Sequence, residues 1–451
     1  MLRPFRQAYA TSKYACRGFT ESLIADCRVH APHLTVSCVM PGEIATALHP
    51  RGKMSAADAS RRIIDGVREG RWHILVGDDA VILDRMLREQ PEAAYGLEFW
   101  EELNAAGVMG SFPVRPVPDQ SVPKLAIEGS LVLVTGGGSG MGREICVQLA
   151  AEGANIAMCD MGEDSMAETK ELCLAANTDA TVTTFACDVS DEAQVTTWRE
   201  AVEQAHDTSG HVLLFNNAGI IGGGSFITDP RSQWELTFDV CWGGVYTCSR
   251  VFMPLLVASE RAAIVNTSSV NGFFASTGPG SPHNAYCSAK FAVRGFTESL
   301  HADLRMNAPH VTPFCVMPGV ITTRITGNSI RLNPIPGKTP SAELIEKAVN
   351  GMTKLQGGQT TAPPDAAATI VDDVKSGRWR ILVGADAEAL DVAVRGASGF
   401  ENNEASPYGF AFHDALEGWQ FKVESSQVTE QARAAEREGV TVAEVTQRVR
   451  L

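Results

Sequence analysis

A strand that runs into a glycine-rich turn and then a helix constrains this chain more than any other feature. Residues 131–142 read LVLVTGGGSGMG, and helical periodicity continues over residues 143–154. Glycines in such a turn let the backbone approach a pyrophosphate, and the helix N-terminus presents free N–H groups and a positive dipole end. The pattern therefore predicts a dinucleotide phosphate site formed by Thr135, Gly136, Ser139, Gly140, Met141 and Gly142.

Strands and helices continue to alternate after this turn. Apolar runs predict strands at residues 131–135, 156–160, 182–186, 212–216, 263–267, 311–316 and 380–383, and helical periodicity fills the gaps. Strands separated by helices in this way form a parallel sheet that is covered on both faces. We therefore expect an α/β fold, a Rossmann-type doubly wound parallel sheet, with a partial repeat of the same fold at the N-terminus.

Asp160 ends the second of these predicted strands, twenty residues after Gly140. A carboxylate at that position accepts hydrogen bonds from both hydroxyls of an adenosine ribose and repels a 2′-phosphate. No Arg or Lys follows immediately to attract that phosphate, so Asp160 favours NAD over NADP as the cofactor. The alternative interpretation is that Asp160 only caps a helix or a turn.

One stretch of the chain occurs twice. Residues 8–46 align with residues 285–323 without a gap, and 25 of the 39 aligned positions are identical. The likeness resumes between residues 69–89 and residues 376–396, where the offset has grown from 277 to 307 residues. The second copy therefore carries 30 additional residues around 326–364, whose Pro, Gly, Asn and Ser content favours a mobile lid over a substrate site.

The first copy contains only the last part of the strand–helix pattern. Half a sheet leaves an open edge and an uncovered face, which is costly for an isolated unit. Four prolines separate it from the glycine turn and predict an extended linker. We therefore expect a partial repeat (residues 1–111), a proline-rich linker (112–124), a complete domain (125–421) and a charged C-terminal tail (422–451).

The net charge of −15 repels phosphate backbones and anionic lipid headgroups, so we expect neither nucleic acid nor a membrane as a partner. No uninterrupted apolar run reaches the roughly 18 residues of a membrane span. The first residues show no apolar signal core, so we expect a soluble, cytoplasmic protein. The 11 cysteines show no metal-ligand spacing, so we expect reduced, mostly buried thiols and no bound metal.

Five further motifs occur in order, and with the glycine turn they resemble the short-chain dehydrogenase/reductase family over residues 125–394. They are CDV at 187–189, NNAG at 216–219, IVNTSS at 264–269, YCSAK at 286–290 and PGVITT at 318–323. The resemblance implies that Ser269, Tyr286 and Lys290 are catalytic, with Ser268 the less favoured serine. It also implies cofactor contacts from Asp188, Val189, Asn217, Ala218, Gly219, Tyr286, Lys290, Pro318, Gly319, Ile321 and Thr323.

Tyr286 and Lys290 are four residues apart and therefore share one face of a helix. A phenol with a pKa near ~10 is a weak base at neutral pH, and an ammonium group beside it favours the phenolate. We expect Lys290 to lower the pKa of Tyr286, which then exchanges a proton with an alcohol or a ketone during hydride transfer. We expect Ser269 to hold the substrate oxygen and stabilise its developing charge.

The resemblance has one departure. Cys241 stands where the family has an Asn, whose main-chain carbonyl assists a proton-relay water. A cysteine keeps that carbonyl and loses the side-chain amide, which puts full activity in question. Two further interpretations stay open: His283 is a surface histidine or part of the site, and Phe273 and Phe274 are core aromatics or an apolar substrate wall.

Tyr9 and Lys13 repeat the tyrosine–lysine spacing in the first copy, where no glycine turn, serine strand or equivalent of Asp160 accompanies them. We interpret these two residues as structural relics. In the family the tyrosine-bearing helix is a common subunit contact, so the resemblance implies that the first copy docks on the complete domain as an internal pseudo-subunit. The rival interpretation is a poorly ordered remnant of a truncated or mis-started tandem gene, and a homo-oligomer is also expected.

The sequence therefore predicts an NAD-dependent oxidoreductase that interconverts a secondary alcohol and a ketone. The substrate is expected to be a small molecule, and the lid and the apolar residues favour a hydrophobic one. The alternative is a nucleotide-binding or assembly protein of the same fold with weakened catalysis. An isomerase, epimerase or dehydratase needs an additional acid–base pair, which these motifs do not supply.

Overall fold

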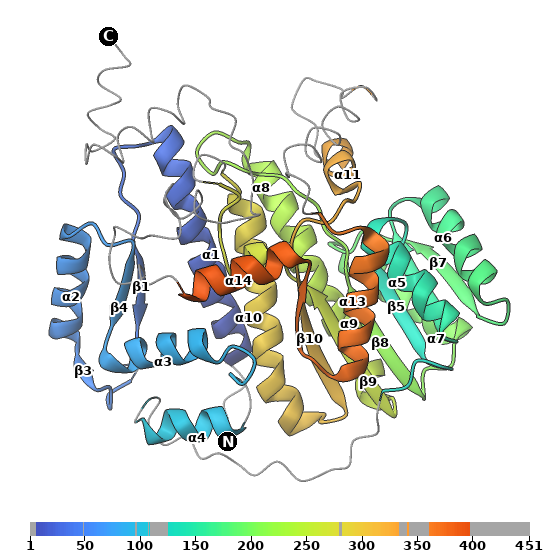
Figure 1. The fold of residues 1–451 in the computed structure, drawn as a ribbon, viewed down its shortest axis with the longest axis horizontal. Coiled ribbons are helices and arrows are strands. Elements are labelled where there is room, and N and C mark those ends of the chain that lie inside the picture. The colour runs from blue at the N-terminus through green and yellow to red at the C-terminus, as the bar shows by residue number, and fades with distance from the viewer. Residues whose placement is uncertain are drawn as a thin grey trace.

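The computed structural model describes residues 6–47, 49–94, 97–106, 108, 125–278, 282–332, 341 and 360–396, whose arrangement Figure 1 shows. The predicted linker at 112–124, the predicted tail at 422–451 and most of the predicted lid lie outside the described residues. The described part contains a complete α/β unit and the N-terminal copy beside it.

Seven parallel strands form the central sheet. Their order is β11-β10-β9-β8-β5-β6-β7, so the winding direction reverses between β5 and β8. The strands are β5 (Leu131–Thr135), β6 (Asn155–Asp160), β7 (Val182–Ala186), β8 (His211–Asn216), β9 (Arg261–Thr267), β10 (Val311–Pro318) and β11 (Arg380–Val383). Every neighbouring pair is parallel, which confirms the predicted doubly wound fold, and β5, β7 and β11 have the predicted bounds.

Helices cover both faces of this sheet. One face carries α5 (Gly140–Ala151), α6 (Glu163–Ala176) and α13 (Pro363–Ser376). The other face carries α7 (Glu192–Ala205), α9 (Gly244–Ala258) and α10 (Asn284–Asn307). Because both faces are buried, the strands are continuous apolar runs instead of alternating ones. The remaining helices of this part are α8 (Arg231–Phe238), α11 (Ile325–Leu332) and α14 (Ala385–Gly396).

Within the described part, the helical run Arg231–Ala258 is long and apolar enough to cross a membrane. It consists of α8, a π-helical turn at Asp239–Gly243 and α9. Half of its most apolar window is buried, and Phe252 and Leu256 pack into the core under the sheet. Because a core helix meets the same criterion, this run is weak evidence for a membrane span.

The N-terminal copy has the same local structure as its counterpart. It contains α1 (Arg6–His30), β1 (Cys38–Pro41), β2 (Ile44–Ala45), β3 (Met54–Ser55), α2 (Ala56–Arg68), β4 (His73–Val76), α3 (Asp78–Glu89) and α4 (Leu97–Ala105). β1 pairs with β4 in parallel with Cys38 opposite His73, and β10 pairs with β11 with Cys315 opposite Arg380. These registers coincide when the sequence offsets are applied, so the repeat in sequence is also a repeat in strand pairing.

Helices α1 and α10 lie side by side and make reciprocal contacts (Figure 1). A Cβ on Gly18 would stand 2.7 Å from Phe291 Cβ, and one on Gly295 would stand 2.5 Å from Tyr14 Cγ. The two glycines occupy equivalent repeat positions, as do the two aromatic residues, so the contact has the form of a two-fold isologous interface. The first copy thus lies against the helix to which the docking hypothesis assigned it.

Candidate active site

The glycine turn connects β5 to α5 at the carboxyl edge of the sheet. Gly136 and Gly140 have φ angles of +69° and +57°, which residues with a side chain rarely adopt. A Cβ on Gly142 would overlap the carbonyl oxygen of Gly136. Ser139 is the N-cap of α5, and Gly140 and Met141 are its first two residues. The N-terminus of α5 follows β5, where the strand order reverses, and sheets of this topology bind ligands at that point.

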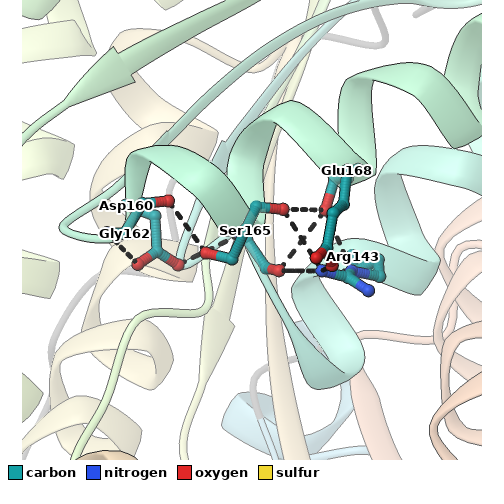
Figure 2. A network of polar contacts seen from close by, with 7 residues as sticks. Arg143, Asp160, Gly162, Ser165 and Glu168 are labelled. Atoms are coloured by element: carbon teal, nitrogen blue, oxygen red, sulfur yellow. Dashed lines mark hydrogen bonds and ion pairs between the residues drawn. The ribbon is translucent and has the colours of Figure 1, made fainter.

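Asp160 lies at the end of β6 beside this turn (Figure 2). Its Oδ2 accepts a hydrogen bond from Gly138 N–H at 3.0 Å and its Oδ1 accepts one from Gly162 N–H at 3.1 Å. The N-cap of α6 is Gly162, so Asp160 does not cap that helix, although both bonds hold turns. An ionised carboxylate has about four acceptor sites, so two remain for a ribose, whose binding stays a prediction.

Arg143 braces the same corner from α5 (Figure 2). Its guanidinium donates to the carbonyl of Gly138 at 2.7 Å, to that of Ser165 at 3.2 Å and to Thr169 Oγ1 at 3.0 Å. It also pairs with Glu168 at 2.9 Å. Arg143 belongs to no motif of the sequence, and its position directly after Gly142 is the one signal that points to it.

The turn after β8 is tied to the end of β5. Thr135 Oγ1 accepts hydrogen bonds from Asn217 N–H at 2.9 Å and from Ala218 N–H at 3.0 Å. Asn217 Nδ2 donates back to the Thr135 carbonyl at 3.2 Å. A Cβ on Gly219 would stand 3.7 Å from Lys290 Nζ. The predicted residues of this turn therefore lie between the glycine turn and the lysine.

The residues after β7 lie at the same edge of the sheet. The Asp188 carboxylate accepts hydrogen bonds from the backbone N–H of Ser190 at 2.9 Å and from its hydroxyl at 2.7 Å. Val189 is buried against Gly244, where a Cβ would stand 2.6 Å from Val189 Cγ2. Both residues therefore follow β7, the strand next to β6, and their contact with an adenine ring stays a prediction.

The loop that begins at Pro318 crosses toward the glycine turn. The Gly319 N–H donates to β11, and Ile321 forms a parallel bridge with the segment before α13. A Cβ on Gly140 would stand 3.0 Å from Thr323 Cγ2, so this loop touches the turn. Two motifs that are almost two hundred residues apart in the sequence therefore meet at one site.

Ser269, Tyr286 and Lys290 come together beyond the end of β9. Ser269 follows that strand, and its side chain is hydrogen-bonded to Tyr286 on the first turn of α10. Lys290 is 2% exposed, and its Nζ lies 5.4 Å from the centroid of the Tyr286 ring. The same Nζ donates to the carbonyl of Thr267 at 2.7 Å. Ser268 donates instead to the main-chain carbonyl of Lys290 at 2.8 Å, so Ser269 is the serine that contacts Tyr286.

The pKa of Tyr286 differs from our expectation. Burial raises this pKa above its ordinary value, the Cys241 sulfur adds to the rise, and the hydrogen bond with Ser269 opposes it. Burial also lowers the pKa of Lys290. The expectation that Lys290 lowers the Tyr286 pKa is therefore wrong for the chain by itself, because burial favours the neutral phenol and outweighs the lowering effect of Ser269. The phenol keeps its proton at neutral pH.

Cys241 lies in the π-helical turn between α8 and α9 and is buried. Its sulfur accepts a hydrogen bond from Ile220 N–H at 3.4 Å, and its S–H donates to the Ile220 carbonyl at 3.2 Å. Such turns are rare and often occur at functional sites. The thiol therefore joins this turn to the loop after β8, and whether its carbonyl serves a proton relay stays a prediction.

The structure bears on the two interpretations that the sequence left open, those of His283 and of Phe273 and Phe274. The ring centroid of His283 lies 4.8 Å from that of Tyr286, so this histidine is part of the site. Burial lowers the pKa of His283 to about 4, so its ring is neutral at ordinary pH. Phe273 and Phe274 are buried in a cluster that contains Phe291, which favours the core interpretation over a substrate wall.

The tyrosine–lysine pair of the first copy has a different setting. Lys13 Nζ lies 5.3 Å from the centroid of the Tyr9 ring, almost the same separation as in the second copy. However, 63% of Tyr9 is exposed, and β1 and β4 carry no glycine turn. This setting agrees with a structural relic, and that interpretation stays a prediction.

Two supporting residues were not predicted. Asn271 Nδ2 donates to the carbonyls of Phe274 at 3.0 Å and Ser276 at 3.1 Å, and so shapes the loop after Ser269. Asn284, at the start of α10, accepts a hydrogen bond from Trp234 Nε1 at 2.7 Å. Both are common polar residues without a motif of their own, so only their three-dimensional neighbours identify them.

The donor set of this site fits a dinucleotide. Backbone N–H groups at the start of α5 suit a pyrophosphate, the Asp160 carboxylate suits a ribose diol, and the Lys290 ammonium suits a second ribose. Within the described ranges, no group of three or more His, Cys, Asp and Glu residues could hold a metal ion. All 11 cysteines are free thiols, and of these Cys16 is exposed and the others are buried.

Comparisons with known proteins agree with this geometry. A sequence profile described as short chain dehydrogenase matches residues 130–332. SadH of Mycobacterium tuberculosis, an oxidoreductase by name, is 34% identical over 270 residues, which cover 60% of this chain and 91% of SadH. Mouse epidermal retinol dehydrogenase 2 is 33% identical over 180 residues, 40% of this chain and 56% of that protein.

Among solved structures, a short chain dehydrogenase/reductase from Burkholderia phymatum in complex with NAD superposes with a TM-score of 0.50. It is 30% identical, and the superposition covers 57% of this chain and 89% of that one. The matched part of the chain contains the glycine turn and the cluster around Tyr286.

Proposed function

Because this chain belongs to the short-chain dehydrogenase family, we propose that it is an oxidoreductase that interconverts a secondary alcohol and a ketone with a nicotinamide nucleotide. The single observation that carries this proposal is the arrangement of Ser269, Tyr286 and Lys290 next to the glycine turn. A hydroxyl, a phenol and an ammonium group meet there at the edge of the sheet that carries the dinucleotide donor set.

In the reduction direction, Tyr286 acts as a general acid. A bound nicotinamide nucleotide would supply hydride to the carbonyl carbon. The Tyr286 phenol gives its proton to the carbonyl oxygen, so that one alcohol forms. The raised pKa of Tyr286 keeps that proton available at neutral pH. Ser269 donates a hydrogen bond to the developing alkoxide and keeps its proton, and the same groups work in reverse when an alcohol is oxidised.

Lys290 stabilises the phenolate of Tyr286 and contacts a ribose in this proposal. It is buried and held by the Thr267 carbonyl, so its charge stays at a fixed distance from the phenol. A buried positive charge stabilises the phenolate that remains after proton transfer, even though it does not set the resting pKa. The remaining donors of the ammonium group are available to a ribose hydroxyl.

We further propose NAD as the cofactor instead of NADP. The carboxylate of Asp160 repels a 2′-phosphate at the ribose site. The nearby guanidinium of Arg143 is already used by main-chain carbonyls and by Glu168, so it offers that phosphate little compensation. The structure of the Burkholderia relative with NAD supports the same choice.

The test is titration of the purified protein with NADH and NADPH, followed by a panel of ketones with NADH consumption as the readout. We expect tighter binding of NADH, turnover of at least one ketone, and loss of turnover without loss of NADH binding in Tyr286→Phe. Absence of NADH binding contradicts the proposal, and so does undiminished turnover in Tyr286→Phe.

Cys241 supports one alternative, a nucleotide-binding or assembly protein with weakened catalysis. Its thiol accepts a hydrogen bond from the Ile220 N–H and donates one to the Ile220 carbonyl, and it lacks the side-chain amide of the family's Asn. The Cys241→Asn variant decides between the two: tight NADH binding without turnover in the natural chain, and turnover gained in the variant, favours the alternative. Comparable turnover in both chains favours the enzyme.

A further inference from the structure

Helix α1 carries buried polar side chains that face the complete domain. Asp26 is 0% exposed, and Ser22, one turn earlier on the same helix, is also buried. A buried carboxylate is costly unless hydrogen bonds satisfy it. The partners of these two residues therefore indicate what α1 does for the rest of the molecule.

The Asp26 carboxylate holds the loop between β8 and α8. Its Oδ1 accepts a hydrogen bond from the Ser225 hydroxyl at 2.7 Å. Its Oδ2 accepts hydrogen bonds from Phe226 N–H at 2.6 Å and Ile227 N–H at 3.3 Å. Phe19 adds an edge-to-face contact with Phe226, with ring centroids 5.0 Å apart. Three donors of one loop thus converge on a single carboxylate from the other copy.

The same loop reaches the site around Tyr286. Ile220, near its start, packs in one small cluster with Tyr286 and Cys241. Farther along, the Gly224 carbonyl accepts a hydrogen bond from Asn284 N–H at 2.8 Å, two residues before Tyr286. The loop is therefore held by Asp26 at one end and borders the proposed substrate side at the other.

A second connection runs from α1 to the start of α10. Asn284 Nδ2 donates to Ser22 Oγ at 2.6 Å and to the Phe19 carbonyl at 3.1 Å. Asn284 Oδ1 accepts from Trp234 Nε1 at 2.7 Å. The first turn of the helix that carries Tyr286 is therefore fastened to α1 as well.

The equivalent aspartate of the second copy behaves differently. Asp303, which aligns with Asp26, is exposed and accepts hydrogen bonds from Gln7 at 2.7 Å and from Asn307 at 2.6 Å. One copy of this aspartate thus supports an active-site loop, and the other lies at the surface. The pair offers a matched comparison of the same residue type on the same helix.

Building on the proposed function, we propose that α1 is a positioning element for the substrate side of the active site, with Asp26 as its main positioning residue. Tyr9 of the first copy is exposed and has no part in this role. The first copy contributes to the second through the contact of Asp26 with the loop between β8 and α8. Asp26 touches neither substrate nor cofactor in this proposal. It acts by fixing the loop that follows Gly219 and the first turn of α10.

The test compares Asp26→Asn with the control Asp303→Asn in the full chain. Amide hydrogen exchange is followed over residues 220–228 and 283–287, and NADH affinity, KM for the carbonyl substrate and kcat are measured. For Asp26→Asn we expect faster exchange in both segments, KM raised about tenfold, and NADH affinity and kcat changed less than about threefold. For Asp303→Asn we expect natural values throughout.

The proposal requires both parts of this result. Exchange that changes only at Phe226 and Ile227 overturns it, and so does an unchanged KM. If Asp26→Asn does not fold, Ser22→Ala removes the smaller connection to Asn284 and is judged in the same way. If the natural chain turns over no ketone, the proposed function has failed, and the exchange pattern alone decides the positioning role.

Discussion

The two copies of the repeat have the same local geometry and different surroundings. Lysine Nζ lies 5.3 Å from the tyrosine ring centroid in α1 and 5.4 Å in α10. Lys13 is exposed, whereas Lys290 is buried and donates a hydrogen bond to the Thr267 carbonyl at the end of β9. Helix spacing fixes the pair distance, because residues four apart lie on one face. The neighbouring sheet edge, which only the second copy has, makes that pair part of a site.

Other elements are copied faithfully because their neighbours are copied too. Glu43 N–H donates to Asp79 Oδ2 at 2.6 Å after β1, and Val320 N–H donates to Asp386 Oδ2 at 2.7 Å after β10. Each bond joins residues within one copy. A contact therefore repeats when both partners are copied, as at Gly18 and Gly295, and it diverges when one partner, such as Ser225, has no counterpart in the repeat.

The largest expected difference between the copies concerns the two tyrosines. We expect Tyr286→Phe to lower kcat by about 10²- to 10⁴-fold, because general acid–base catalysis is worth that much. Tyr9→Phe should leave kcat and KM unchanged, since the described part of the first copy has no counterpart of the glycine turn or of the strand that leads to Ser269. Steady-state kinetics of both variants test this comparison, and any loss of kcat in Tyr9→Phe contradicts the relic interpretation.

Asp160 belongs to the complete copy only and should control cofactor choice. In Asp160→Ala the repulsion of a 2′-phosphate disappears, so we expect the preference for NADH over NADPH to fall about tenfold or more. Glu171→Ala is the control for a general loss of negative charge nearby, because Glu171 is an exposed residue of the same helix α6 that carries Glu168. Fluorescence titration with both nucleotides measures the ratio, and a ratio unchanged in Asp160→Ala refutes the assignment.

Sequence patterns were enough for the fold and for naming residues that the structure brings together, and the roles of those residues stay predictions. The glycine turn, Asp160 and the strand ends have local signals in the sequence, namely apolar runs and the spacing of the glycines. The structure agrees with them in the positive φ angles of Gly136 and Gly140 and in the order of the strands. The pKa of Tyr286 was predicted with the wrong sign, because burial depends on the packed environment and not on the spacing to Lys290. The role of Asp26 has no local signal in the sequence, since its partners are about 200 residues away in the chain.

The raised pKa of Tyr286 also predicts different pH profiles for the two directions of the reaction. Its pKa is raised, so the phenol is protonated across the neutral range and ketone reduction should be nearly independent of pH. Alcohol oxidation needs the phenolate, whose fraction rises about tenfold per pH unit below the pKa. We expect log kcat for oxidation to rise with a slope near one between about pH 6 and 9. Initial rates in both directions test this, and a flat oxidation profile contradicts Tyr286 as the base.

The smallest expected effect tests the reciprocal contact between α1 and α10. Alanine at Gly18 or Gly295 adds a Cβ within 2.7 Å of Phe291 or 2.5 Å of Tyr14. Overpacking costs about 1–3 kcal/mol, and alanine returns about 1 kcal/mol of helix propensity, so each variant should lose about 1 kcal/mol of unfolding free energy. Gly396→Ala, where a Cβ meets nothing within 4 Å, is the control. Equal losses at Gly18 and Gly295 in urea unfolding support a two-fold contact. A gain in stability at both positions shows that the two helices do not pack in solution.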